Sequence, residues 1–277
     1  MNLKTTDMDM LHGSLTVKLL LFTLPIALSS MAQQLFNAAD TAVVGYFGNE
    51  GTLAAVGTNT EVIALIVTVS SGLAIGVNIL ISNHIGQNKK AEMPAAVQTS
   101  MLLAGIIGIL GLLFGQAVAA PLLRLIQTPS GIFEEAKLYL RIYMLGYPFL
   151  LLYDFGASVL RARGDSRYPF FALMISGIAN VGLNLLFVIW FRMGVAGVAI
   201  ATDISTILSA FVVLQRLIND KMFQLTFLGP RFSLRIARNI LKTGIPSAVL
   251  FSALPIFLCR HLSTASAKRR LRAVPLP

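Results

Sequence analysis

Residues 95–120 read AAVQTSMLLAGIIGILGLLFGQAVAA and contain no charged side chain. A helix needs about 20 consecutive apolar residues to cross the hydrocarbon core of a bilayer. This stretch is long enough, and it lacks the short alternating pattern of a membrane β-strand. Because the backbone cannot form hydrogen bonds with lipid, a continuous apolar run of this kind predicts a transmembrane helix.

The rest of the chain has a similar composition. Of its 277 residues, 56% are apolar and 12% are charged, and the mean hydropathy is +0.76. An average soluble domain is about 25% charged. So few charges exclude a soluble enzyme, a disordered chain and a nucleic-acid-binding protein. The single cysteine, Cys259, excludes an intramolecular disulfide, and no spacing of a zinc, redox or cofactor site occurs.

Glycine, proline and charged residues divide the chain into seven apolar runs. We therefore predict an all-α membrane protein, a six-helix transmembrane bundle followed by a seventh helix. The predicted spans are 15–44, 53–83, 95–120, 136–160, 169–191, 195–217 and 239–259.

Basic residues are distributed unevenly between the two sets of loops. One side carries Lys89 and Lys90, then Arg161, Arg163 and Arg167, within a net charge of +10. Loops on the opposite side carry little beyond Arg124, Lys137 and Arg192. Since lysine and arginine concentrate in cytoplasmic loops, this predicts a multi-pass protein of the cell (inner or plasma) membrane with its N-terminus in the cytoplasm.

Two spans begin alike. Residues 18–28 read KLLLFTLPIAL and residues 238–249 read RNILKTGIPSAV, each with a base, a threonine and then a proline. Six spans separate Pro25 from Pro246, so both helices start from the same side of the membrane. This pattern is typical of a parallel repeat, in which two six-helix halves pack around an axis along the membrane normal.

The second half of such a repeat is incomplete in this sequence. The segment 218–238 alternates apolar and basic residues, which favours a cytoplasmic linker on the membrane surface over a dedicated lipid-binding site. The basic tail has no helical apolar period, so we expect a truncated gene product. The predicted parts are the six-helix N-lobe 1–217, the inter-lobe linker 218–238, the first helix of an incomplete C-lobe 239–260 and an atypical basic tail 261–277.

Several polar residues fall inside the predicted spans, where polar groups are costly and tend to be functional. By their position along the spans, Asp40, Asn180, Asn184, Thr202 and Asp203 share one depth in the outer half of the membrane. A carboxylate with amide and hydroxyl neighbours can exchange a proton or bind Na⁺, because hard cations prefer oxygen ligands. For the amides and the hydroxyl, plain helix–helix hydrogen bonding is the alternative.

Two further intramembrane acids have weaker functional interpretations. Asp154 is near the basic loop, and a structural role, such as pairing with Arg161, is favoured. Glu61 begins its span close to the interface, where a charge costs less.

Four stretches resemble the N-terminal half of the multidrug and toxic compound extrusion (MATE) transporters. They are FNAADTAVVG at residues 36–45, followed by LAAVG at 53–57; NHIGQ at 83–87; LRARGDS at 160–166, with Pro169; and NVGLN at 180–184, followed by GVAGVAIAT at 194–202. The similarity extends over about residues 14–258.

The resemblance implies the N-lobe of a 12-helix secondary antiporter, which exports drugs or organic cations in exchange for H⁺ or Na⁺. It implies that Asp40, Asn180 and Thr202 form the N-lobe cation or proton site, where Na⁺ is the candidate metal ion, and that Tyr139 lies beside it. Asn184 occupies a position where many relatives carry aspartate. No cofactor other than the coupling ion is implied, and the missing C-lobe would come from another chain.

Two other interpretations stay open at this point. One is a lipid-linked oligosaccharide flippase of the same superfamily, which the lack of lysine or arginine deep inside the spans disfavours. The other is a non-transporting membrane remnant or scaffold.

Overall fold

The computed structural model describes residues 15–48, 50–89, 91–220, 222–223, 232–250 and 252. Within these ranges all regular structure is helical, which confirms the all-α membrane fold. The elements are α1 (Leu15–Phe47), α2 (Glu50–Gly86), α3 (Met93–Leu125), α4 (Phe133–Leu145), α5 (Tyr147–Ala162), α6 (Arg167–Leu185), the π-helix η1 (Leu186–Trp190) and α7 (Gly194–Asn219). Residues 234–250 are also helical.

The helices agree with the predicted spans to within a few residues at most ends. By length and apolar composition, four of the described helices can cross a membrane, and the bent pair α4–α5 makes a fifth. The seventh helix begins at residue 234, inside the segment predicted as linker. Outside the described residues lie residue 251 and residues 253–259 of the predicted seventh helix, together with the whole of the basic tail 261–277.

The predicted single helix 136–160 is wrong in one respect, because the chain breaks there into two helices that meet at 46°. Pro148, in the first turn of α5, has no N–H to donate to the preceding turn, and its ring crowds that turn. Glycines on α3 leave room for the break. A methyl group at Gly108 would lie only 2.6 Å from the Pro148 Cα, and one at Gly111 would collide with the Tyr147 ring.

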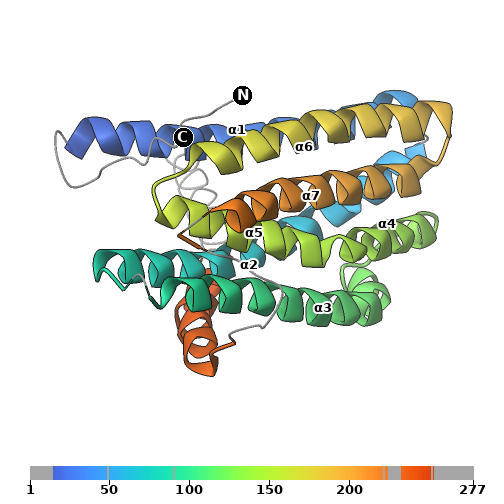
Figure 1. The fold of residues 1–277 in the computed structure, drawn as a ribbon. Coiled ribbons are helices and arrows are strands. Elements are labelled where there is room, and N and C mark those ends of the chain that lie inside the picture. The colour runs from blue at the N-terminus through green and yellow to red at the C-terminus, as the bar shows by residue number, and fades with distance from the viewer. Residues whose placement is uncertain are drawn as a thin grey trace, which may run out of the picture.

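Helix α5 forms the centre of the bundle and packs against α2, α3 and α7 (Figure 1). Its side chains at Leu151, Phe155, Val159 and Leu160 are almost completely buried. Helices α1 and α6 lie side by side along one edge, and α7 separates α6 from α5 and α4. This order places the amides of α6 between α1 and α7.

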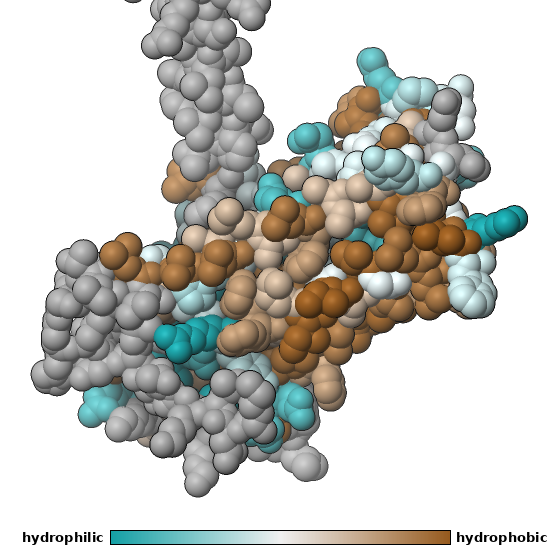
Figure 2. Space-filling model, turned by 90° about the horizontal axis from the view of Figure 1, so that it is seen from above, coloured by the Kyte–Doolittle hydropathy of each residue, from teal (hydrophilic) through white to brown (hydrophobic). Residues whose placement is uncertain are grey.

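Exposed apolar side chains cover much of the outside of the bundle. Phe114, Ile178 and Phe211 are each more than 60% exposed although they lie within the spans. Figure 2 shows brown, apolar residues over a large part of the face it presents. A soluble protein rarely exposes an apolar surface this extensive, so the surface fits a hydrocarbon environment.

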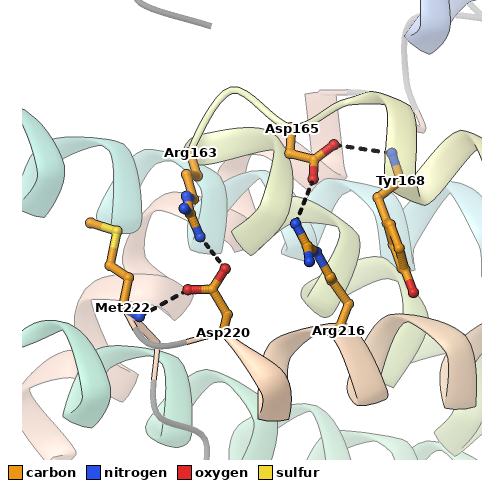
Figure 3. Close-up of polar contacts among 6 residues, drawn as sticks. All are labelled: Arg163, Asp165, Tyr168, Arg216, Asp220 and Met222. Atoms are coloured by element: carbon orange, nitrogen blue, oxygen red, sulfur yellow. Dashed lines mark hydrogen bonds and ion pairs between the residues drawn. The ribbon is translucent and has the colours of Figure 1, made fainter. Parts of the chain in front are cut away.

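Two ion pairs tie the loop between α5 and α6 to the end of α7, and we call them the clasp (Figure 3). Arg163 pairs with Asp220, and the Arg216 guanidinium lies 3.9 Å from the Asp165 carboxylate. The same carboxylates accept backbone N–H bonds, Asp165 from Tyr168 at 3.1 Å and Asp220 from Met222 at 2.9 Å. The clasp therefore holds the C-terminal end of α7 against the loop between α5 and α6.

The clasp lies at the end of the bundle that also carries Lys89, Arg161 and Arg167, and we call it the basic end. The helix formed by residues 234–250 crosses α2 near this end. Gly72 faces Ala248, and Gly76 faces Ile240 and Gly244. The G-x-x-x-G spacing of Gly72 and Gly76 in α2 therefore permits close packing of the two helices.

Candidate functional site

The site begins where α1 approaches α6 most closely. Gly177 on α6 lies against the Phe36 ring on α1, and any side chain at 177 would collide with that ring. Asp40 lies one turn beyond Phe36, and Asn184 lies two turns beyond Gly177. Because residues four apart share a helical face, this contact brings Asp40 and Asn184 together.

A chain of hydrogen bonds joins four of the predicted site residues. The Asn184 Nδ2 donates to Asp40 Oδ1 and, at 3.3 Å, to Asn180 Oδ1. The Asn180 Nδ2 lies 3.4 Å from the Thr202 Oγ1, which itself donates to the carbonyl of Val198 at 3.0 Å. The structure therefore links α1, α6 and α7 through one carboxylate, two amides and one hydroxyl.

The two amides at the centre of this hydrogen-bond network are buried, and one of their acceptors is unused. Asn184 has no exposed surface and Asn180 is 4% exposed. The Asn184 Oδ1 has no hydrogen-bond partner, although buried polar atoms are nearly always paired. Among the described residues, the ion pairs lie elsewhere and none involves Asp40. The site thus offers a carboxylate and a free amide oxygen without a protein cation.

Tyr139 lies on α4, beside the hydrogen-bond network formed by Asp40, Asn184, Asn180 and Thr202. Its ring stacks on Tyr143 with centroids 6.5 Å apart, and its side chain is buried. Its hydroxyl is within electrostatic range of both Asp40 and Asp203. Tyr139 therefore belongs to the same polar region, although no direct hydrogen bond joins it to Asp40 within the described part of the chain.

Asp203 lies apart from the hydrogen-bonded chain. Its carboxylate contacts Gly146 and accepts a hydrogen bond from the backbone there, at the break between α4 and α5. A side chain at position 146 would collide with this carboxylate. Asp203 is therefore placed to stabilise the break between α4 and α5. Through this contact it also fixes the end of α4, the helix that carries Tyr139.

The two remaining intramembrane acids lie outside the site. Asp154 is buried on α5, where Ser71 hydrogen-bonds to it and its Oδ2 has no partner. Within the described structure no ion pair joins it to Arg161, which was one example of the structural role expected for Asp154. Glu61 is exposed on α2.

Sequence reasoning missed two positions that shape the site, Gly177 and Gly146. Gly177 shares a face of α6 with Asn180 and Asn184. This spacing could have indicated that the glycine lies at the helix contact that positions the two amides. Gly146 stands two residues before Pro148, a pair that marks a helix break.

The sequence matches the MatE family over residues 25–186. It is 29% identical over 242 residues to the probable multidrug resistance protein YpnP of Bacillus subtilis (strain 168), covering 87% of this chain and 54% of that protein. It is 25% identical over 239 residues to the probable multidrug resistance protein NorM of Thermotoga maritima, covering 84% of this chain and 51% of that protein.

The fold is similar to a solved outward-facing structure of a multidrug resistance MATE family transporter of the MOP superfamily. The TM-score is 0.83 at 24% identity, over 91% of this chain and 56% of that one. The chain spans about half the length of the relatives it matches. The family match includes Asp40, Tyr139, Asn180 and Asn184, and it covers more than half of this chain. The chain therefore belongs to the MatE family of multi-pass membrane transporters.

Proposed function

We propose that this chain forms the ion-coupling half of a secondary antiporter that exports drugs or other organic cations. The coupling ion, H⁺ or Na⁺, binds at Asp40. The basic end faces the cytoplasm of a cell membrane, and a second lobe completes the transport pathway. Support comes from the family, from relatives whose names describe multidrug resistance, and from the polar chain between α1 and α7.

The observation that carries the proposal is the Asn184 amide, which donates to the Asp40 carboxylate while its own oxygen has no hydrogen-bond partner. Even a half-buried carboxylate without a cation is costly in a membrane. A proton removes its charge, and Na⁺ neutralises it while accepting the Asn184 oxygen as a ligand. Either ion turns an unfavourable arrangement into a satisfied one, which is what a coupling site requires.

Ion binding and drug binding are coupled if both ligands need the Asp40 charge, or if they bind to different conformations of the chain. An ion that lowers the affinity for a drug must have its own affinity lowered by the drug to the same extent. The chain itself can therefore be tested for coupling by binding alone, without the second lobe.

The test measures ethidium binding to the purified chain in nanodiscs, by fluorescence, while Na⁺ replaces choline and while pH is varied. We expect the ethidium affinity to change with one of these ions. Asp40→Asn should abolish that response, because the amide binds neither ion as a carboxylate does. Glu61→Gln, which removes an exposed carboxylate from a neighbouring span, should keep it. An ion response that persists in Asp40→Asn would refute the proposal.

A further inference from the structure

A polar cavity lies at the basic end, between α2 and the helix formed by residues 234–250. Its volume is about 240 Å³. Two apolar residues and six polar ones line it: Ile79, Leu80, Asn83, His84, Gln87, Asn239, Lys242 and Thr243. The cavity lies along the half of α2 that is nearer the basic end, whereas Asp40 lies toward the opposite end of the bundle. The proposed coupling site uses none of the residues that line it.

The cavity is a consequence of the way the two helices cross. They touch where Gly76 meets Ile240 and Gly244, and the cavity opens along α2 beyond this contact. The His84 ring is held in place, with Nδ1 2.9 Å from the Leu80 carbonyl oxygen and Nε2 3.6 Å from Glu92 Oε2. Thr243 bonds to carbonyls of its own helix. Each wall of the cavity therefore contains one polar side chain that its own contacts hold in place, His84 on α2 and Thr243 on the facing helix.

The other polar groups are not engaged with the protein. Within the described part of the chain, the side chains of Asn83, Gln87, Asn239 and Lys242 make no hydrogen bond or ion pair with another residue. Three amides and an ammonium group thus converge on one opening with their donors unused. This combination suits an anion with several oxygen acceptors.

The electrostatic surroundings favour the same kind of ligand. Arg235, Arg238 and Lys242 recur at a spacing that places them on one side of their helix, and Lys89 follows the end of α2. The nearby acid, Glu92, is already directed at His84. Basic pockets between membrane helices near the cytoplasmic surface bind the headgroups of anionic lipids.

We propose that this cavity binds a phosphate group, presented either by the headgroup of an anionic membrane lipid or by free inorganic phosphate. Lys242 supplies the charge, and the amides of Asn83, Gln87 and Asn239 donate to the phosphate oxygens. Because the ligand touches both helices, it stabilises the contact between α2 and the helix of residues 234–250. The site is independent of Asp40.

Native mass spectrometry of the whole chain tests this proposal. The chain is released from detergent with phosphatidylglycerol, with phosphatidylcholine, or with phosphatidylglycerol plus inorganic phosphate. We expect phosphatidylglycerol to be retained in preference to phosphatidylcholine. Lys242→Gln should weaken that retention about five-fold, the effect of one lost cation near a membrane surface. Asn83→Ala, on the opposite wall, should also weaken it.

Arg167→Gln is the matched control, because it removes an exposed cation from the same end of the bundle but outside the cavity. Its lipid retention should equal that of the wild type. Circular dichroism should show unchanged helix content in all three variants. Displacement of the lipid by inorganic phosphate would identify free phosphate as an occupant, and retention of the lipid in its presence would assign the site to the headgroup.

Two outcomes would overturn the proposal. Equal losses in Lys242→Gln and Arg167→Gln would mean that the lipid responds only to the overall charge of this surface. Unchanged retention in both Lys242→Gln and Asn83→Ala would mean that the cavity does not bind phosphate.

Discussion

Gly177 determines how closely α1 approaches α6, and one methyl group at this position tests that contact. In Gly177→Ala the new carbon collides with the Phe36 ring, so the two helices must separate. We expect a loss of about 1–3 kcal/mol in the free energy of unfolding, as for other overpacked cores. Titration of the folded chain with SDS, followed by circular dichroism, measures this change.

The same helix offers a control of opposite sign. A methyl group at Gly182 meets nothing within 4 Å. Because alanine is a better helix former than glycine, Gly182→Ala should stabilise the chain by about 0.5–1 kcal/mol. Destabilisation of similar size in both variants would show that the close contact at Gly177 is not what matters.

Much of the site was predictable at the level of single residues. Asp40, Asn180, Asn184 and Thr202 stood out because polar groups in apolar spans are costly, and the alternation of span directions put them at one depth. The sequence did not indicate which amide would bond to which group. That depends on the spacing of α1 and α6, which Gly177 and Phe36 set through a contact between residues distant in the chain.

At the scale of the helices, Asp203 links α7 to the break between α4 and α5. Asp203→Leu removes the acceptor at Gly146 and should lower the free energy of unfolding by about 1–3 kcal/mol. Asp203→Asn keeps a carbonyl oxygen in that position, so it should cost less. Thermal unfolding in detergent compares the two variants, and equal losses would contradict this role for Asp203.

The clasp allows a comparison of two ion pairs in one loop. Asp220 is 9% exposed and pairs directly with Arg163, whereas Arg216 and Asp165 are more exposed and 3.9 Å apart. We expect double-mutant cycles to give a coupling energy of about 1.5–3 kcal/mol for Arg163 with Asp220. The coupling of Arg216 with Asp165 should stay below about 1 kcal/mol and fall with added salt. The reverse order would refute this account of the clasp.

The sequence predicted the number and place of the helical regions better than their internal geometry. Long apolar runs fix where a helix must be, because the bilayer leaves the backbone no other partner. The break at Gly146 and the π-helix at Leu186–Trp190 depend on packing as well as on local sequence. The glycines of α3, for example, accept a bent neighbour that the run of apolar residues alone did not reveal.

At the scale of the whole molecule, the uneven basic charge predicts an orientation. Lys89 lies at the basic end and Arg192 at the opposite end, and both are exposed. In a Cys259→Ser background, Arg192→Cys should react with a membrane-impermeant maleimide in intact cells. Lys89→Cys should react only after the cells are permeabilised. Labelling with the opposite pattern would invert the proposed topology.

The central claim is that Asp40 itself binds the coupling ion, and infrared difference spectroscopy of the chain in lipid tests it directly. Spectra are recorded as Na⁺ replaces choline and as pH is stepped, for the wild type and for Asp40→Asn. The account predicts a carboxyl band that changes with one of these ions in the wild type and is missing from Asp40→Asn. An identical set of bands in both proteins would contradict it.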